Sequence, residues 1–202
     1  MLIFLAVCPI LGVPAGLLIR PYLASGGLLA ALGFFFLVGL LAVAAAVIPL
    51  GRMAWPALGL RPTGWRPLVL GALGTLALSV VVSQSGLQPE GMKQALNVSR
   101  EPSQFAAALF VIAGLGPLVE ELVFRGLFYG WLEGRWNSRI AWIVSSLAFA
   151  AAHFEPSHIL LVLPLGLLFG YLRRRTNSLV PSLVAHMANN GFAVVAAAFL
   201  AP

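Results

Sequence analysis

Seven apolar segments dominate this 202-residue chain and constrain its fold more than any other feature of the sequence. Short stretches carrying Pro, Gly, Arg and other polar residues separate them. About 20 apolar residues in a helix cross the hydrocarbon core of a bilayer, and a helix satisfies its own backbone hydrogen bonds there. We therefore predict an all-α, polytopic transmembrane helical bundle with seven membrane helices, near residues 2–19, 26–50, 67–83, 105–132, 140–154, 158–172 and 179–200.

The composition predicts one integral-membrane domain over residues 1–202. Charged residues make up 9% of the chain and hydrophobic residues 60%, whereas a soluble domain carries about 25% charged residues. The longest polar connection, residues 83–104, is too short for a domain and is expected to be a surface loop. The N-terminal segment lacks a positively charged start, which favours a first membrane helix over a signal peptide.

The basic residues predict an orientation in the membrane rather than nucleic-acid binding, because they lie at the ends of apolar segments. Cytoplasmic loops of membrane proteins carry an excess of Lys and Arg. This rule predicts a cytoplasmic N-terminus. The alanine-, leucine- and arginine-rich residue usage indicates the cytoplasmic membrane of a prokaryote. With seven crossings, one side holds Arg52, Arg61, Arg66, Arg135, Arg139 and Arg173–Arg175, and the other holds Arg20, Lys93 and Arg100.

Few ionisable side chains lie inside the predicted segments, and those few are expensive to bury and therefore mark candidate functional positions. Counted at about 1.5 Å per residue, they reach similar depths in the bilayer. Three helices are thus predicted to bring a carboxylate, two imidazoles and an amide together. The residues are Glu120, Glu121 and Arg125 in the fourth segment, His153 in the fifth, and His186 with Asn190 in the seventh.

Helical spacing separates the two adjacent glutamates. Glu121 and Arg125 are four residues apart, with Glu on the N-terminal side, which favours an ion pair on one helix. We assign this pair to structure and orientation. Glu120 points about 100° away from Glu121 and has no partner on its own helix. On the fifth segment, Phe149 shares a face with His153 and is expected to orient it.

Pro117 predicts a kink in the fourth segment. It has no N–H and would leave the carbonyl of Ala113 without its helical partner. If the helix restarts at this point, Glu120 lies in the first turn of the new helix, where the positive end of the helix dipole favours a carboxylate.

These polar residues suit activation of a water molecule, by either of two mechanisms. Without a metal, Glu120 acts as general base, His153 and His186 orient the water or stabilise a tetrahedral intermediate, and Asn190 donates to the oxyanion. Alternatively, Glu120, His153 and His186 form a zinc site with an open position for water. We favour the metal-free mechanism with no cofactor, because zinc would occupy Glu120 and the soluble zinc-protease signature HExxH is absent.

Three motifs resemble those of the CAAX prenyl protease and bacteriocin-processing (CPBP) family of intramembrane proteases. They are "EELVFR" at 120–125, "FAAAH" at 149–153 and "HMANN" at 186–190, in this order on successive apolar segments. The resemblance implies a glutamate-type endopeptidase with a catalytic core at 105–200. It maps the family's functional residues onto Glu120, Arg125, His153, His186 and Asn190. The family core is described with eight helices, so an eighth is expected if the fourth segment counts as two pieces.

The sequence thus predicts an intramembrane endopeptidase that cleaves a membrane-bound or lipid-modified peptide or protein. Its expected partners are this substrate and membrane lipids. Two alternatives stay open. One is a proton-coupled transporter, which also needs buried Glu, His and Arg side chains. The other is a non-proteolytic binding protein that resembles a bacteriocin-immunity factor. His158 and the arginines at 173–175 are assigned to the membrane interface and to topology.

Overall fold

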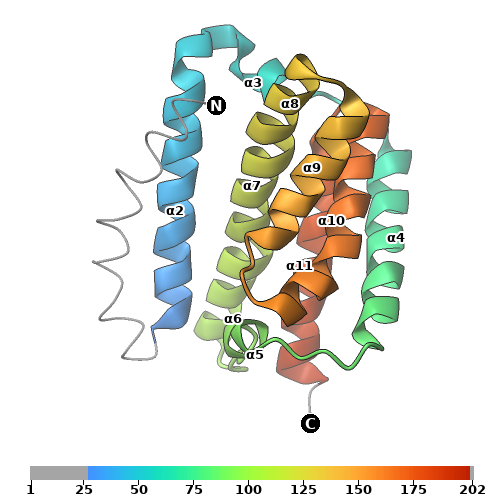
Figure 1. The fold of residues 1–202 in the computed structure, drawn as a ribbon. Coiled ribbons are helices and arrows are strands. Elements are labelled where there is room, and N and C mark those ends of the chain that lie inside the picture. The colour runs from blue at the N-terminus through green and yellow to red at the C-terminus, as the bar shows by residue number, and fades with distance from the viewer. Residues whose placement is uncertain (1–26, 201–202) are drawn as a thin grey trace.

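The computed structural model describes residues 27–200 and consists of helices joined by short connections (Figure 1). The predicted first segment, 2–19, lies outside the described residues. No strand occurs between residues 27 and 200, so the all-α prediction is confirmed for this part of the chain. The α-helices are α2 (Leu28–Val47), α3 (Ala54–Ala57), α4 (Trp65–Ser83), α5 (Glu90–Ala95), α6 (Pro102–Ala108), α7 (Gly116–Glu121), α8 (Tyr129–Arg135), α9 (Ser138–Ala151), α10 (Pro156–Thr176) and α11 (Val180–Phe199).

Within residues 27–200, five helical stretches are long and apolar enough to cross a membrane, which confirms an integral membrane protein. They are Leu28–Ala57, Trp65–Ser83, Pro102–Arg135, Pro156–Thr176 and Val180–Phe199. The predicted segment at 140–154 corresponds to α9, which has 14 residues. At 1.5 Å per residue such a helix is only about 21 Å long, so it falls short of a full crossing and lies against α10 instead.

The fourth predicted segment is one continuous helical stretch from Pro102 to Arg135, with two π-helical turns between α6, α7 and α8. The N–H of Gly116 donates to the carbonyl of Val111, five residues earlier, and Pro117 has no N–H to offer. The π-helical turn therefore accommodates the proline without a break in the helix. In this turn the residue five positions after Ile112 is Pro117, so the carbonyl of Ile112 has no helical donor. The expected restart of the helix at Pro117 is not seen, and Glu120 does not lie in a first turn.

Helices α9 and α10 pack closely because two glycines on α10 face α9. A Cβ atom at Gly166 would lie 2.8 Å from the Phe149 ring, and one at Gly170 would lie 2.6 Å from the Ser146 hydroxyl. The two glycines are four residues apart, the spacing that lets membrane helices approach each other closely. The Trp142 indole N–H fixes the register by donating to the carbonyl of Leu167 at 2.8 Å.

Arg173, which we assigned to topology, also has a structural role at the arginine-rich end of the bundle, because it is 3% exposed. Its Nε donates to the carbonyl of Arg125 at 3.1 Å, and its guanidinium lies 4.7 Å from the centre of the Tyr129 ring. Gly59, with φ +75°, passes so close that a Cβ there would lie 2.8 Å from the Arg173 guanidinium. This arginine therefore ties α10 to α8 and to the connection between α3 and α4.

Candidate active site

Glu121 and Arg125 form a fully buried ion pair at the centre of the bundle. Arg125 Nη1 lies 3.1 Å from Glu121 Oε1, as the spacing of four residues predicts, and both side chains are 0% exposed. Arg125 Nη2 donates to the carbonyl of Gly166 at 2.9 Å. The guanidinium also lies 4.3 Å from the centre of the Phe149 ring. The pair therefore links the fourth predicted segment to α9 and α10.

His186 connects the two adjacent glutamates. Its Nδ1 lies 3.2 Å from Glu121 Oε1, within hydrogen-bond distance, and its Nε2 lies 3.7 Å from Glu120 Oε2. The imidazole also stacks on Phe169, with ring centres 4.7 Å apart. Since a carboxylate only accepts, Nδ1 carries the hydrogen and donates to Glu121. Glu121 thus fixes the ring, and Nε2 is the nitrogen that faces Glu120.

Exposure distinguishes the two glutamates. The Glu120 side chain is 26% exposed, whereas Glu121 is 0% exposed. Among residues 27–200, the polar contact recorded for the Glu120 side chain is with His186 Nε2, and the separation of 3.7 Å is too long for a direct hydrogen bond. Contacts of this length commonly include a bridging water. Glu120 is therefore the accessible carboxylate of the site.

Phe149 lies between the two histidines. Its ring centre is 5.2 Å from that of His153 and 5.6 Å from that of His186, edge to face in both cases. Its carbonyl lies 3.0 Å from His153 Nδ1. A carbonyl only accepts, so His153 Nδ1 carries the hydrogen and Nε2 is free for other partners. Phe149 thus orients His153 through its backbone and both imidazoles through its ring.

Asn190 satisfies the carbonyl that Pro117 leaves free. Its Nδ2 donates to the carbonyl of Ile112 at 3.0 Å, while the Nδ2 of Asn189 donates to Asn190 Oδ1 at 3.3 Å. Both asparagines line the same cavity. The side-chain amide of Asn190 therefore joins α11 to the π-helical turn that precedes α7. The second N–H of this amide remains available for another acceptor.

One cavity of about 850 Å³ brings the candidate catalytic residues together. Its walls come from α2, α4, α5, the fourth predicted segment and α9 to α11, and they are mainly apolar. Its lining extends to exposed residues such as Gln88 and Leu200, so it reaches the surface at the end opposite the arginine-rich one. The candidate residues on its wall are Glu120, His153, His186 and Asn190.

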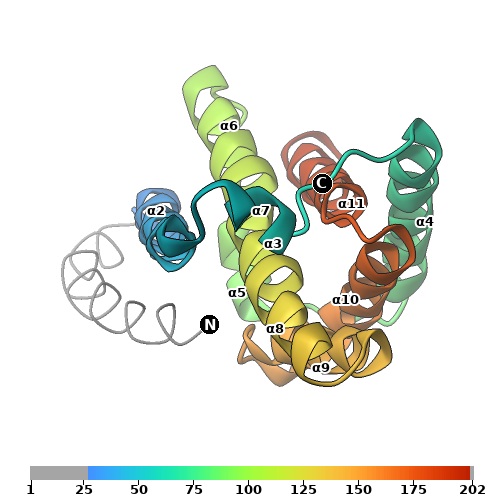
Figure 2. The same cartoon turned by 90° about the horizontal axis from the view of Figure 1, so that it is seen from above.

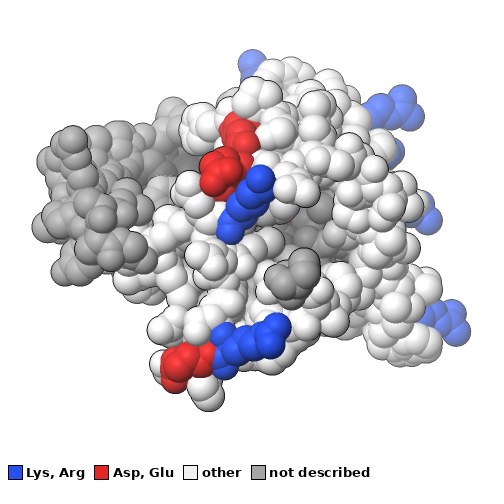
Figure 3. Space-filling model, turned by 90° about the horizontal axis from the view of Figure 1, so that it is seen from below, with Lys and Arg blue, Asp and Glu red and all other residues white. Residues whose placement is uncertain are grey.

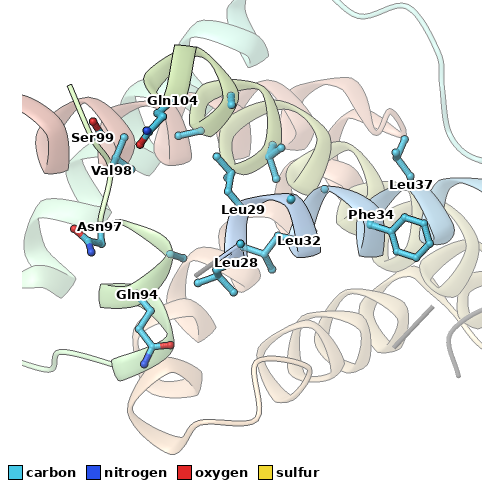
Figure 4. A pocket seen from close by; sticks show the side chains of 17 residues that line it. Leu28, Leu29, Leu32, Phe34, Leu37, Gln94, Asn97, Val98, Ser99 and Gln104 are labelled. Carbon is cyan, nitrogen blue, oxygen red and sulfur yellow. The ribbon is translucent and has the colours of Figure 1, made fainter. Parts of the chain in front are cut away.

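A second cavity, of about 830 Å³, lies between α2 and the stretch from α5 to α6 (Figure 4). Its wall combines apolar residues such as Leu29 and Phe34 with the amides Gln94, Asn97 and Gln104. Among the residues that the structure describes, no ionisable side chain lines it. The candidate acid–base residues therefore line the other cavity.

His158 is a site neighbour that the sequence did not reveal. Its ring centre lies 4.5 Å from that of His153, and it lines the same cavity. We assigned it to the interface because it follows Pro156 in a connecting stretch. The sequence feature that could have predicted this contact is the short connection between His153 and Pro156. It reverses the chain, so the start of α10 lies beside the end of α9.

The three residues considered as zinc ligands do not fit a zinc site in this geometry. Among residues 27–200, no group of three His, Cys, Asp or Glu side chains is arranged to hold a metal ion. His186 already faces a glutamate with each nitrogen, and His153 Nδ1 contacts a backbone carbonyl.

The fold defines an integral membrane protein, and its cavity brings a carboxylate, two imidazoles and an amide together. Residues 102–192 match the family described as type II CAAX prenyl endopeptidase Rce1-like. This match confirms, for that region of the chain, the resemblance predicted from the three motifs.

Two curated relatives are each similar to less than half of the chain. "Putative membrane peptidase YdiL" of Bacillus subtilis (strain 168) is 33% identical over 92 residues, which are 45% of this chain and 38% of the relative. "Membrane-embedded CAAX protease MroQ" of Staphylococcus aureus (strain USA300) is 36% identical over 93 residues, 43% of this chain and 38% of the relative. The chain therefore spans well under half the length of these relatives. No solved structure matches it significantly.

Gly166→Ala is expected to damage the site through Phe149. The added methyl group would lie 2.8 Å from the Phe149 ring. This ring contacts both histidines and Arg125, so a shift of the ring would disturb these contacts. Overpacking of this kind destabilises a protein by about 1–3 kcal/mol. Gly134→Ala is the matched control, because nothing lies within 4 Å of its added Cβ. Thermal unfolding in detergent should separate the two variants, and equal stability would contradict the close packing of α9 on α10.

Proposed function

We propose that this protein is an intramembrane endopeptidase in which Glu120 activates the attacking water. The observation that carries the proposal is the unequal placement of the two glutamates. Glu121 is neutralised by Arg125 and hydrogen-bonded to His186, whereas Glu120 is partly exposed in the cavity with His186 Nε2 3.7 Å away. A water at hydrogen-bond distance from both atoms fits this separation.

The proposed reaction assigns one role to each residue. Glu120 accepts a proton from the water, whose oxygen forms a bond to the carbonyl carbon of the substrate. His186 Nε2 accepts the second O–H of the water and so orients it. The second N–H of Asn190 donates to the oxyanion of the tetrahedral intermediate. When the C–N bond breaks, Glu120 returns its proton to the leaving amine.

His153 and Arg125 have different proposed roles. His153 Nε2, which faces away from the Phe149 carbonyl, accepts a hydrogen bond from the substrate amide and helps to align it. Arg125 does not reach the reacting atoms. It keeps Glu121 ionised and in place, and Glu121 in turn holds the His186 ring.

The proposed substrate is a membrane-bound or lipid-modified peptide or protein. The cavity is mainly apolar and lies among helices that cross the bilayer. The matched family is named for CAAX prenyl endopeptidases, and one relative is named a membrane-embedded CAAX protease. An apolar chain attached to the peptide would be accommodated by such walls.

We also propose that the N-terminus is cytoplasmic. Eight arginines (Arg52, Arg61, Arg66, Arg135, Arg139 and Arg173–Arg175) belong to the connections at one end of the bundle, whereas Lys93 and Arg100 lie at the other. The positive-inside rule places the arginine-rich end in the cytoplasm. A reporter fused after residue 202, active on only one side of the membrane, tests this orientation.

The test of the proposed function is cleavage by the purified protein in detergent or liposomes. The probe is a fluorogenic peptide with a farnesylated Cys-a-a-X end, beside the same peptide without the lipid. We expect hydrolysis at a single bond, identified by mass spectrometry. Absence of cleavage for both peptides, together with uptake of protons or peptide into liposomes, would contradict the proposal in favour of transport.

A further inference from the structure

The connection between α4 and α6, expected to be a plain loop, contains the short helix α5 and forms part of the cavity wall. Gly91, Met92, Ala95 and Leu96 line the cavity that holds Glu120 and the histidines. Figure 1 shows α5 lying at the end of the bundle opposite α3 and α8. This helix is therefore a wall of the active cavity at the end where the cavity reaches the surface.

The outward side of α5 is charged. Lys93 Nζ lies 4.0 Å from Glu90 Oε2, and the side chains of Lys93 and Glu90 are 49% and 70% exposed. Figure 3, seen from below, shows basic and acidic side chains side by side on an otherwise uncharged face. α5 thus separates an apolar interior from solvent.

By itself, α5 cannot hold this position. It has six residues, and isolated helices shorter than about 12–15 residues are marginal in water. Its N-cap residue is Pro89, whose side chain cannot accept a hydrogen bond, so α5 has no cap of its own. The first N–H groups of the helix must find an acceptor elsewhere.

Glu155 supplies that acceptor from another part of the chain. It is the N-cap residue of α10 but makes no side-chain cap bond to α10. Its Oε1 accepts the N–H of Glu90 at 2.9 Å and its Oε2 accepts the N–H of Gly91 at 3.2 Å. The hydroxyl of Ser157 donates to Oε1 at 2.9 Å. A carboxylate at a helix N-terminus also interacts favourably with the helix dipole.

The charge of Glu155 persists at neutral pH. The hydrogen bond from the N–H of Glu90 is the main cause that holds the pKa of Glu155 below its usual value, and the Ser157 hydroxyl adds to it. The connection between α9 and α10 that carries Glu155 also carries His153, two residues earlier, with His158 packed against it. One short connection therefore links a candidate catalytic residue to the anchor of α5.

We propose that Glu155 is a positioning residue that caps α5 and holds it as a removable wall of the active cavity, and that Met92 and Leu96 on this wall limit the size of the apolar substrate group. The limit on substrate size rests on the endopeptidase function proposed above. The role of Glu155 in holding α5 is independent of that function, because the position of α5 is measurable without any substrate.

The first experiment measures access to the cavity. Cys8, the single cysteine of the chain, is replaced by Ser, and Ala193→Cys places a thiol on the cavity wall contributed by α11. We expect Glu155→Ala to accelerate labelling of this thiol by a maleimide about tenfold, since loss of a helix cap shifts an equilibrium by about that factor. Glu155→Asp, which keeps the carboxylate, should restore most of the protection.

Glu101→Ala is the matched control. Glu101 is also a carboxylate at a helix N-cap, but within the described residues its carboxylate accepts from Gln104 and Ser103 of its own helix, α6, and from no residue of α5. Labelling in this variant should equal that of the parent protein. Equal labelling in the Glu155→Ala and parent proteins would overturn the proposal.

The second experiment measures substrate size. We expect Glu155→Ala to raise the ratio of kcat/KM for a geranylgeranylated peptide to that for a farnesylated one about fivefold, because a displaced wall tolerates a longer chain. A merely misfolded fraction would lower both values and leave their ratio unchanged. Faster labelling with an unchanged ratio would overturn the size limit. A parent protein that cleaves neither peptide would contradict the proposed function, while labelling would still decide the role of Glu155.

Discussion

Glu120→Gln is expected to lower kcat/KM for peptide hydrolysis by about a thousandfold while leaving the fold intact. A general base contributes about 10²–10⁴ to a rate, and Gln has nearly the same shape but cannot accept the proton of the attacking water. The fold should survive because the Glu120 side chain is 26% exposed and makes no hydrogen bond to the part of the chain that the structure describes. Initial rates with the fluorogenic peptide and thermal unfolding in detergent are the two measurements.

Glu133→Gln is the control for this variant. Glu133 lies on α8, outside the active cavity, and contacts Tyr129 at 3.4 Å. It should change neither the rate nor the stability appreciably. Turnover by a folded Glu120→Gln protein at the parent rate would remove the general-base role from Glu120.

Arg125→Ala should have the largest effect on stability of the changes considered. It removes the counter-charge of Glu121, which is 0% exposed, together with a hydrogen bond to Gly166 and the contact with Phe149. Breaking a buried ion pair by removing one partner costs about 3–5 kcal/mol. We expect a sharp fall in the yield of monodisperse protein and in the temperature at which it aggregates.

Two comparisons separate the ion pair from general effects of removing an arginine. Arg175→Ala alters an exposed side chain at the end of α10, and surface changes of this kind stay within about 0.5 kcal/mol. The double variant Glu121→Gln with Arg125→Met removes both charges and should be less destabilised than Arg125→Ala. Equal yields of the Arg125→Ala and Arg175→Ala proteins would contradict the structural role of the pair.

Local spacing was enough to predict much of the site. The interval of four residues predicted the Glu121–Arg125 pair, and hydropathy predicted the helices that carry Glu120, His153 and His186. Similar depth in the bilayer then predicted that these residues meet in one place. Each of these inferences uses the rise and period of a helix, which the sequence determines directly.

The individual hydrogen bonds between distant parts of the chain could not be predicted. The hydrogen bond from His186 to Glu121 joins two helices whose relative rotation is set by packing. Pro117 shows in the sequence that one backbone N–H is missing, but not whether the helix responds with a kink or with a π-helical turn. The outcome depends on a donor for the free carbonyl of Ile112, and in the structure this donor is Asn190. The helix α5 depends on Glu155, 65 residues away from Glu90.

Metal analysis of the purified, active protein, together with its activity after exhaustive chelation, decides how the attacking water is activated. We assign this step to the Glu120 carboxylate beside the His186 imidazole. We therefore expect full peptide hydrolysis with zinc far below one ion per chain, and no change after chelation. Complete loss of hydrolysis on chelation, reversed by adding zinc, would contradict the role of Glu120.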